Sequence, residues 1–382
     1  RQLMEAPYYR DLFREHGLSP NDLASVTDLP AFPILDRATL GDEWREIAVV
    51  DEEARAWRDA AVVKSSGTTG DPISVVRDGY DLVHMWTMVR FWATVYEVDL
   101  PDRPVVVLLC DLPGGLEYSS KLPTFGDGHL YRISTRQPRT LERLVEAEPD
   151  VLFSDPAGFH WLADRSASLD PRIVLSSAQY LAPSLRDRTE SRLEAPLVNY
   201  YSTSETGPVA WECSANTGHF HVLVPDVWVE SVAGEVTVTR LRPSQFPLLR
   251  YQPGDAGRVE FEDCRCGYRG WSIVEFECRR VCEFVRPDGE TVDAWQLARL
   301  FKHRSLGQFR VTQSASSAFR IELVDGDDVR ESAALHDELA AALERLGWSD
   351  VAITVDTVSE LTSSGGKPQP FRCDVEADTS DR

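Results

Sequence analysis

The sequence predicts an α/β protein with a large N-terminal α/β domain that contains parallel and antiparallel sheets, followed by a small α+β domain. Three patterns lead to this prediction. Short apolar runs alternate with helical segments between residues 105 and 175, as in parallel sheets covered on both faces. Between residues 222 and 260 apolar and polar residues alternate, which is typical of antiparallel strands. A shorter strand and helix pattern follows a hinge expected near residues 278–283, so we expect domains at 1–280 and 281–382.

The large domain is expected to begin with helices and turns over residues 1–60, where Asp36 is the N-cap of a short helix that runs to Trp44. Apolar residues on both sides of residues 64–72 predict two flanking strands. A long aromatic-rich helix is predicted over residues 79–97, and most of its large side chains are expected in the core. Further elements are predicted as a helix at 140–148 and strands at 105–109, 151–153, 172–175 and 235–239.

The small domain is expected to combine three strands with one helix. The strands are predicted at residues 309–312, 319–324 and 351–355. Residues 332–346 carry a leucine at every third or fourth position of one stretch, which predicts an amphipathic helix. Gly347 follows directly, and glycine is the residue type that most often ends a helix.

The composition limits the classes of partner. The 382 residues include 62 acidic and 40 basic residues, a formal charge of −22, which argues against nucleic acid because phosphate neutralisation needs clustered Lys and Arg. No apolar run approaches the roughly 20 residues that span a bilayer, so no membrane partner is expected. The seven cysteines, an odd number, predict reduced thiols in a cytoplasmic protein. The opening Arg1-Gln2-Leu3 has no initiating Met and no signal pattern, as expected of a sequence trimmed at its start.

One loop carries the strongest chemical signal, and it reads Lys64-Ser65-Ser66-Gly67-Thr68-Thr69-Gly70-Asp71-Pro72. Glycines allow the backbone to approach a ligand closely, and the hydroxyl and N–H groups of this loop can all face one anion. A polyphosphate site is therefore predicted, although the loop lacks the Gly-Lys-Ser/Thr that leads into a helix in nucleoside-triphosphate loops. Taken alone, the stretch is explained equally well as a surface hairpin rich in Ser, Thr and Gly.

Three further motifs follow in a fixed order. They read Asn199-Tyr200-Tyr201-Ser202-Thr203-Ser204-Glu205-Thr206-Gly207, then Tyr251-Gln252-Pro253-Gly254-Asp255, then Ser364-Gly365-Gly366-Lys367. With the loop, they resemble the core motifs of the adenylate-forming (ANL) superfamily, and the motif variants are most similar to its phenylacetate-CoA ligase branch. The resemblance covers nearly the whole chain and implies an acyl-adenylate synthetase-like fold, with a small mobile C-terminal domain that carries the catalytic lysine.

The resemblance implies an acid–thiol ligase that uses ATP and Mg²⁺ to adenylate a carboxylic acid, with an aromatic acid expected, and that releases pyrophosphate. The acyl-AMP would pass to CoA, to a carrier-protein thiol or to a downstream enzyme, in secondary-metabolite biosynthesis such as that of an antibiotic. A homodimer is also among the expected assemblies. Two alternatives stay open: activation of the acid for an amine or another acceptor, and a nucleotide-binding protein without turnover.

The resemblance also assigns roles around the nucleotide. Ser65, Ser66, Gly67, Thr68, Thr69 and Gly70 would hold the β- and γ-phosphates. Tyr201 would stack on adenine, and Asn199 would accept a hydrogen bond from the adenine amine. Ser204 would contact phosphate and Glu205 would hold Mg²⁺, a cation that prefers carboxylate, phosphate and water oxygens.

Further positions receive a role from the same resemblance. Ser177, Ala178 and Gln179 would lie beside the adenine and the acyl pocket, and Asp255 would accept the ribose hydroxyls. Arg279 or Arg280 would touch ribose or phosphate. Lys367 would be placed by domain closure against the charge that grows between carboxylate and α-phosphate.

The chain departs from the family at the hinge. The family pattern there is Gly-Arg-x-Asp-Asp, whereas residues 278–283 read Cys-Arg-Arg-Val-Cys-Glu. Because no aspartate stands at the hinge position, the usual domain rotation and the thioester-forming second step stay open.

A separate group of residues has the spacing of metal ligands. Cys264 and Cys266 form a Cys-x-Cys-Gly segment, and Cys213 and the pair His219 and His221 precede it. Four soft or borderline ligands fit a structural, tetrahedral Zn²⁺ that pins a loop. Similar segments occur in the phenylacetate-CoA ligase branch, where His221 matches better than His219, and the choice between the two stays open. The alternative is a set of free thiols beside two strand histidines.

Overall fold

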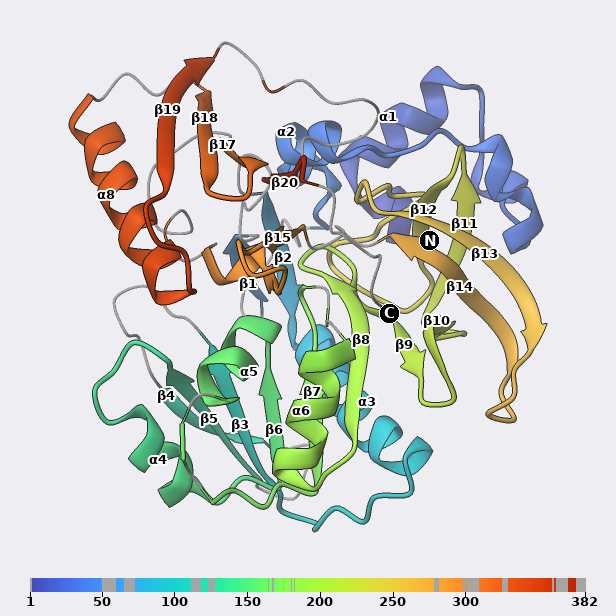
Figure 1. Cartoon of the computed structure of the whole chain (residues 1–382). Coiled ribbons are helices and arrows are strands. Elements are labelled where there is room, and N and C mark those ends of the chain that lie inside the picture. The colour runs from blue at the N-terminus through green and yellow to red at the C-terminus, as the bar shows by residue number, and fades with distance from the viewer. Residues whose placement is uncertain are drawn as a thin grey trace. The chain divides into compact units, whose positions relative to one another are not determined.

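The computed structural model of the chain (Figure 1) describes residues 2–49, 60–64, 73–110, 118–122, 128–163, 165–166, 168–179, 181, 183–277, 282–297, 300, 309–324, 329–358, 361 and 370–375. The described residues form two compact units, one up to residue 277 and one from residue 282 onward. The expected boundary after residue 280 falls at positions outside the described residues, so the division of roles between two domains stays a prediction.

The first unit is built on a twelve-stranded sheet in the order β11-β12-β13-β14-β10-β9-β8-β7-β6-β3-β5-β4 (Figure 1). Strands β5, β3, β6, β7 and β8 run parallel, and the other neighbouring pairs are antiparallel. The two halves of the sheet therefore meet at β8. The strands are β3 Val105–Cys110, β4 Tyr118–Leu122, β5 Gly128–Ser134, β6 Val151–Ser154, β7 Ile173–Ser176, β8 Leu197–Thr203, β9 Gly207–Cys213, β10 Asn216–Val222, β11 Val227–Val232, β12 Glu235–Arg240, β13 Ala256–Asp263 and β14 Arg269–Glu277.

Helices cover both faces of this sheet, and they are α3 Gly79–Val95, α4 Thr140–Ala147, α5 Pro156–Ala163 and α6 Pro183–Leu193. Successive side chains of a strand point to opposite faces. Val106 accordingly belongs to the core beneath α3, where the rings of Trp92 and Tyr200 lie 4.3 Å apart. Val107 belongs to the core on the other face, with Phe159 of α5 and residues of α4 and α6. The predicted covering of the parallel strands on both faces is confirmed.

Residues 2–49 form helices and turns, as predicted, and pack against strands of the first unit. They contain η1 Gln2–Glu5, α1 Pro7–Glu15, η2 Pro20–Asp22, η3 Val26–Ala31 and α2 Arg37–Ile47. Asp36 caps α2 by accepting a hydrogen bond from the Thr39 N–H at 2.7 Å, and the helix continues one turn beyond the expected Trp44. Leu35 donates to the Arg250 carbonyl at 3.0 Å and accepts from the Gln252 N–H at 2.9 Å. This exchange ties the start of α2 to the segment that leads to Asp255.

The strands predicted on both sides of the Ser/Thr/Gly loop are present. β1 Ala60–Lys64 and β2 Ser74–Asp78 pair antiparallel, with Lys64 opposite Ser74. The loop itself, residues 65–72, lies outside the described residues. The hairpin that would present a phosphate loop is therefore formed, while the role of the loop stays a prediction.

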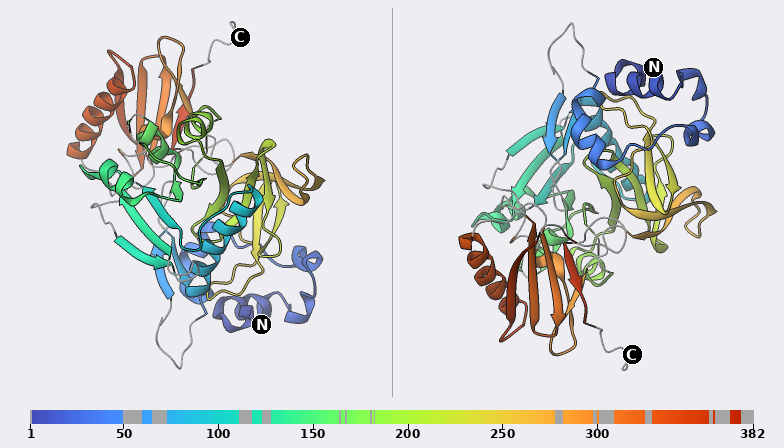
Figure 2. Two further views of the ribbon diagram at one scale, coloured as in Figure 1. Left: turned by 90° about the horizontal axis from the view of Figure 1, so that it is seen from below. Right: turned by 90° about the horizontal axis from the view of Figure 1, so that it is seen from above.

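The second unit combines a four-stranded sheet, in the order β19-β18-β17-β20, with one helix. Leucines at 335, 339 and 343 of α8 are buried against this sheet, and Figure 2 shows the helix beside it. Gly347 follows α8 with a φ of +99°, a conformation that glycine adopts without strain. The elements are β15 Glu283–Val285, β16 Thr291–Asp293, η6 Ala294–Leu297, β17 Phe309–Ala315, β18 Ala318–Val324, α8 Val329–Arg345, β19 Ala352–Val358 and β20 Phe371–Cys373.

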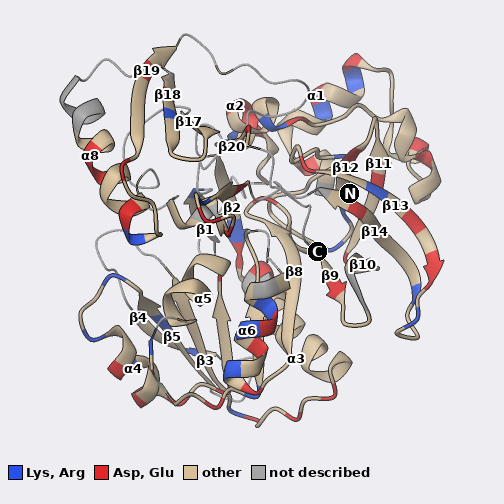
Figure 3. Cartoon of the chain, viewed as in Figure 1, with Lys and Arg blue, Asp and Glu red and all other residues tan. Residues whose placement is uncertain are grey.

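Acidic and basic residues are both scattered over the helices and strands (Figure 3). The acidic excess of the sequence is thus spread over many elements of each unit. Among the residues that the structure describes, no helix has the length and apolar character that a bilayer crossing requires.

Candidate functional site

Two predicted motifs come together at β8, where the parallel and antiparallel halves of the sheet meet. We call this part of the sheet the seam. Asn199 and Tyr201 belong to β8, and Ser177 follows the carboxyl end of the neighbouring β7, where Ser176 is paired with Asn199. The hydroxyl oxygens of Ser177 and Ser202 lie 2.8 Å apart, so the two motifs are in contact. In open α/β sheets ligands bind outside the carboxyl ends of the strands, at the point where the strand order changes.

The turn after β7 has an unusual backbone. Ala178 adopts a φ of +75°, a left-handed conformation that is uncommon for a residue with a β-carbon. Such strain persists only where the surrounding structure imposes it, and it is frequent in ligand sites. Together with the half-buried Gln179, it marks residues 177–179 as part of the candidate site.

A hydrogen bond joins the second and third motifs. The Tyr201 hydroxyl donates to Asp255 Oδ2 at 2.8 Å, across 54 residues of sequence. Tyr201 is buried and its ring packs on Phe276, with centroids 4.5 Å apart. Burial, followed by the neighbouring Asp255 carboxylate, raises the pKa of the Tyr201 hydroxyl well above its usual value, so it remains a donor.

Glu205 is a buried carboxylate with a cationic partner. It is 2% exposed, and its Oε1 accepts a hydrogen bond from Arg37 Nη1 at 2.7 Å. Arg37 is the first residue of α2, 168 positions earlier in the chain. Within the part of the chain that the structure describes, no other residue is bonded to this carboxylate, so Oε2 is left for a further ligand. Burial and then Glu205 raise the pKa of the nearby Tyr251 hydroxyl, and Arg37 opposes them.

Two arginines hold the turn that carries Ser204 and Glu205. Arg77 of β2 donates to the backbone carbonyls of Ser204, at 2.5 Å, and Thr203, at 3.4 Å. Gly207 ends the turn with a φ of +74°, and a β-carbon there would lie 3.2 Å from side-chain nitrogens of Arg77 and Arg242. The turn is therefore packed directly against partly buried guanidinium groups. A positively charged environment of this kind suits the binding of anions.

Asn199 is fixed by a second buried acid. Its amide nitrogen Nδ2 donates to Glu212 Oε2 at 3.0 Å. Glu212 also forms an ion pair with Arg186 of α6. The side chain of Asn199 is thus oriented by residues of β9 and α6.

A cluster of three cysteines and one histidine forms in the antiparallel half of the sheet. The ligand atoms of Cys213, His221, Cys264 and Cys266 all lie within 4.8 Å of one another. The Sγ atoms of Cys213 and Cys264 are 3.5 Å apart, and Cys266 Sγ is 3.3 Å from His221 Nε2. His221 Nδ1 contacts Ser272 Oγ at 2.9 Å, which turns Nε2 toward the cysteines.

The two histidines lie differently relative to the cysteines. His219 Nδ1 lies 3.3 Å from Glu262 Oε1, and His219 contributes no atom to the cluster. His221 is paired in register with Trp211 of β9. Cys213 stands two residues after Trp211 on the same strand, so it faces the side of the sheet that His221 faces. The four residues expected as metal ligands are thus the four that converge.

The remaining site predictions differ in what the structure says of them. Asn199, Tyr201, Ser204, Glu205, Asp255 and residues 177–179 lie in the first unit, around the seam. The residues outside the described part of the chain are Ser65, Ser66, Gly67, Thr68, Thr69, Gly70, Arg279, Arg280 and Lys367. Sequence reasoning missed Arg37, Arg77 and Glu212. Nothing in the local pattern of these three residues distinguishes them from the surface charge of a helix or a strand.

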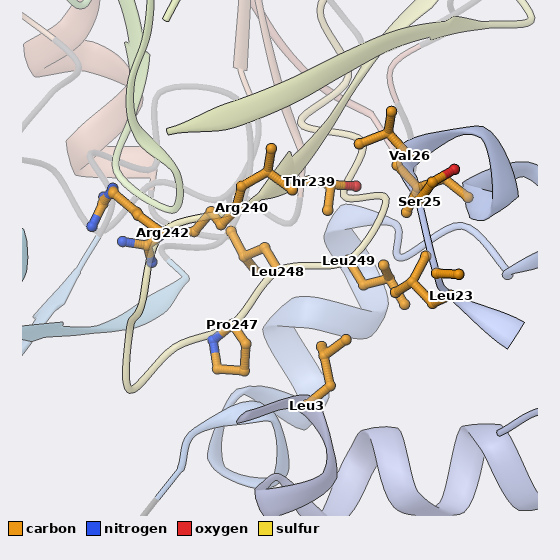
Figure 4. A pocket seen from close by; sticks show the side chains of 13 residues that line it. Leu3, Leu23, Ser25, Val26, Thr239, Arg240, Arg242, Pro247, Leu248 and Leu249 are labelled. Carbon is orange, nitrogen blue, oxygen red and sulfur yellow. The ribbon is translucent and has the colours of Figure 1, made fainter. Parts of the chain in front are cut away.

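One pocket of about 380 Å³ lies elsewhere in the first unit (Figure 4). Its lining is mostly apolar and includes Leu3, Leu23, Val26, Leu248 and Leu249. It lies between the helical lead-in and the segment that follows β12. None of its lining residues belongs to the predicted motifs, but they include Arg242, whose guanidinium also lies against the turn at Gly207.

Comparisons with known proteins agree with this architecture. No family model matches the chain. The phenylacetate-coenzyme A ligase of Aromatoleum evansii is 26% identical over 289 residues, which are 66% of this chain and 62% of the relative. The enzyme of the same description from Thermus thermophilus is 26% identical over 293 residues, or 68% and 63%. The chain thus spans less than two thirds of the length of these relatives.

A crystal structure of 2-hydroxyisobutyryl-CoA ligase in the postadenylation state superposes with a TM-score of 0.59 at 16% identity, over 98% of this chain and 86% of that one. The same ligase in its thioesterification state also gives 0.59, at 16% identity over 98% and 87%. Sequence identities as low as 16% support a conclusion about the fold only. The chain therefore has the mixed α/β fold of adenylate-forming CoA ligases, and its sequence is similar to that of phenylacetate-CoA ligases.

Proposed function

We propose that this protein is an acid–thiol ligase that uses ATP to adenylate a carboxylic acid and transfers the acyl group to CoA. The observation that carries the proposal is the hydrogen bond between Tyr201 and Asp255 at the seam. It unites two motifs that the resemblance assigns to one nucleotide, one to its base and one to its ribose. The similarity to phenylacetate-CoA ligases supports the same activity.

Each predicted residue would contact a different part of the nucleotide. Tyr201 would stack its ring on the base, and Asn199 would accept a hydrogen bond from the exocyclic amine of adenine. Asp255 receives the Tyr201 hydroxyl at Oδ2, which leaves Oδ1 for the ribose hydroxyls. Ser204 and the loop of residues 65–70 would contact phosphate, and Lys367 would stabilise charge at the α-phosphate.

The carboxylate of Glu205 fits a hard cation. One oxygen is held by Arg37 and the other is available, and a carboxylate joined by phosphate and water oxygens is a common Mg²⁺ environment. When bound, Mg²⁺ supplies positive charge that offsets the charge of the phosphates. Arg77 and Arg242, packed behind the turn, add to the positive charge that two approaching anions require.

The finer assignments rest on the motif variants. An aromatic acid is proposed because the variants resemble those of the phenylacetate-CoA ligase branch. A role in secondary-metabolite biosynthesis is proposed because the motifs are similar to those of the griseoluteate-adenylating enzyme of phenazine antibiotic formation. A carrier-protein thiol or a downstream enzyme would then be an alternative acceptor of the acyl-AMP, and assembly as a homodimer belongs to the same proposal.

The cysteine–histidine cluster is proposed to hold a structural Zn²⁺. Three sulfur atoms and one imidazole nitrogen converge within 4.8 Å, and this donor set suits tetrahedral zinc. The contact of His221 Nδ1 with Ser272 is of the kind that orients metal-bound imidazoles. Four protein ligands leave no open position, so the metal would fasten β9 and β10 to the turn at residues 264–267.

The deciding experiment is pyrophosphate release from ATP and Mg²⁺ with a panel of aryl and alkyl acids. Acid-dependent release, with acyl-CoA identified by mass in the presence of CoA, is the expected result. Lys367→Ala should lower the rate by at least about 100-fold while ATP still binds. Pyrophosphate release without acyl-CoA, but with a product formed on an amine or a carrier thiol, would shift the acceptor. ATP binding with no release for any acid would leave a nucleotide-binding protein without turnover.

A further inference from the structure

We propose that Glu212 determines which nucleobase this site accepts, by fixing the direction in which the amide of Asn199 points. Glu212 would hold the amide nitrogen of Asn199, so that the carbonyl oxygen Oδ1 faces the base and accepts from the amino group of adenine. The inference rests on the proposed function, and it adds to that function a residue that selects ATP over GTP.

The contacts of Glu212 carry the argument. Glu212 belongs to β9 and is 5% exposed. Its Oε2 lies 3.0 Å from Asn199 Nδ2 and is paired with Arg186, and its Oε1 accepts from the Gly218 N–H at 2.8 Å. Both oxygens of the carboxylate are therefore occupied by groups of the protein.

The identity of these groups decides the orientation of the amide. A guanidinium and a backbone N–H can only donate hydrogen bonds, so both oxygens of Glu212 act as acceptors. The atom of Asn199 that faces Glu212 must then be its amino group. Its carbonyl oxygen consequently points to the opposite side, where no described residue donates to it.

Arg186 is a further donor to Glu212, in addition to Gly218 and Asn199. Its Nη1 donates to the Leu197 carbonyl at 2.8 Å, two residues before Asn199 on β8. Arg186 also pairs with Glu190 of the same helix at 3.7 Å. The guanidinium thus has partners on both sides, and if Glu212 turned away from Asn199 this partly buried cation would lose its closest acid.

The two purine bases differ at the position that Asn199 would read. Adenine carries an amino group that donates to Oδ1, whereas guanine carries an oxygen that can only accept. Two acceptors facing each other leave both unpaired, and sites built to hydrogen-bond one group reject analogues that lack it. A fixed Asn199 therefore favours ATP, whereas an amide free to rotate would accept either base.

The test compares ATP and GTP dissociation constants, measured by calorimetry at one Mg²⁺ concentration without acid. In Arg186→Met/Glu212→Gln the donor-only guanidinium is gone. The new amide at position 212 can then accept from Gly218 and donate to Asn199, which must rotate its own amide. The preference for ATP over GTP should fall at least about tenfold. Arg186→Met alone is the matched control, because Glu212 still accepts from Asn199, and its preference should stay within about threefold of wild type.

A third variant keeps the test decisive if the double variant does not fold. Asn199→Ala leaves Glu212 and Arg186 in place and should also lose the preference for ATP by about tenfold. An unchanged preference in the double variant or in Asn199→Ala overturns the inference. If the wild type forms acyl-AMP from ATP and the preference does not move, only the role of Glu212 fails. If the wild type binds neither nucleotide, the proposed function fails as well.

Discussion

The acids at the seam of the sheet and the cysteine–histidine cluster are stabilised in different ways. At the seam Glu205 and Glu212 are both buried, and each has a cationic partner within the protein. Glu205 is paired with Arg37 from α2, and Glu212 is paired with Arg186 from α6. These partners come from helices that are distant in sequence, so the pairs form only when the first unit is folded.

The cluster is built without such pairs, as far as the described residues extend. Its four ligand atoms face one another, with Cys213 and Cys264 at 3.5 Å and Cys266 and His221 at 3.3 Å. All four residues lie on two neighbouring hairpins of the antiparallel half. When a cation binds to such a cluster of soft ligands, the folded protein is stabilised.

The difference separates the two expected roles. The seam has its charges balanced before any ligand arrives, and it is therefore suited to bind and release a nucleotide. The cluster is expected to hold its ion permanently, because the free energy of binding becomes free energy of folding. Variants at the seam should consequently change activity, and variants at the cluster should change stability.

Glu205→Gln is expected to have the largest effect. The variant keeps the shape of the side chain but removes the charge proposed to hold Mg²⁺, so kcat/KM for acid-dependent pyrophosphate release should fall by about 100-fold or more. A Mg²⁺ titration of the rate separates weakened metal binding from slower chemistry. Glu275→Gln is the matched control, because Glu275 is exposed and pairs with Arg258. Wild-type Mg²⁺ dependence in Glu205→Gln would remove this residue from the metal site.

Cys264→Ser should leave activity nearly unchanged and reduce stability. Zinc measured by elemental analysis should fall from about one ion per chain to nearly none, and the midpoint of thermal unfolding should drop by about 5 °C or more. Activity per folded molecule should stay within about threefold, because the pairs at the seam are intact. Cys110→Ser is the control, since Cys110 contributes no atom to the cluster. Full zinc content in Cys264→Ser would contradict the ligand assignment.

Arg37→Gln tests the pair at the seam directly. The variant leaves the buried Glu205 carboxylate without its cation, which should reduce the free energy of unfolding by about 3 kcal/mol. Arg37→Gln/Glu205→Gln should recover most of this loss, because neither charge is then unpaired. Arg45→Gln on the same helix is the control, since Arg45 is exposed over the Trp44 ring and its loss should cost less than about 0.5 kcal/mol. Strictly additive losses in the denaturation experiment would show that the pair is not coupled.

The same contrast explains what could be predicted from sequence. The three cysteines of the cluster and the pair His219 and His221 were proposed as metal ligands from the Cys-x-Cys-Gly and His-x-His spacing, whereas the convergence of His221 with the cysteines is seen only in the structure. The motif residues at the seam were predicted because each lies in a recognisable run. Arg37 could not be predicted, since its partner Glu205 lies 168 residues away in the sequence.

Most of the strands and helices of the fold were also predicted from the sequence. Alternating apolar runs identified the parallel strands and the helices between them, because burial on both faces leaves a strong pattern. Helix ends were predicted less accurately: α8 begins at Val329 rather than at the expected Ser332, although Asp328 followed by Glu331 has the spacing of an N-terminal capping box. Glu212 lies in β9, where all seven residues are buried, and an acid there is explained only by Arg186 from another element.

The smallest expected effect concerns pH and a third buried acid of the first unit. Burial alone would raise the pKa of Asp81, but Arg240 and Arg242, with Arg77 beyond them, outweigh it and lower that pKa below its usual value. A carboxylate whose pKa is depressed by folding contributes stability above its unfolded value of about 3.9, and this contribution disappears as the pH falls through the folded value. The stability difference between wild type and Asp81→Asn should therefore be constant from about pH 5 to 7 and shrink below about pH 4. Urea denaturation across this range measures the difference, and a difference that grows on acidification would mean that Asp81 is not held ionised by its arginines.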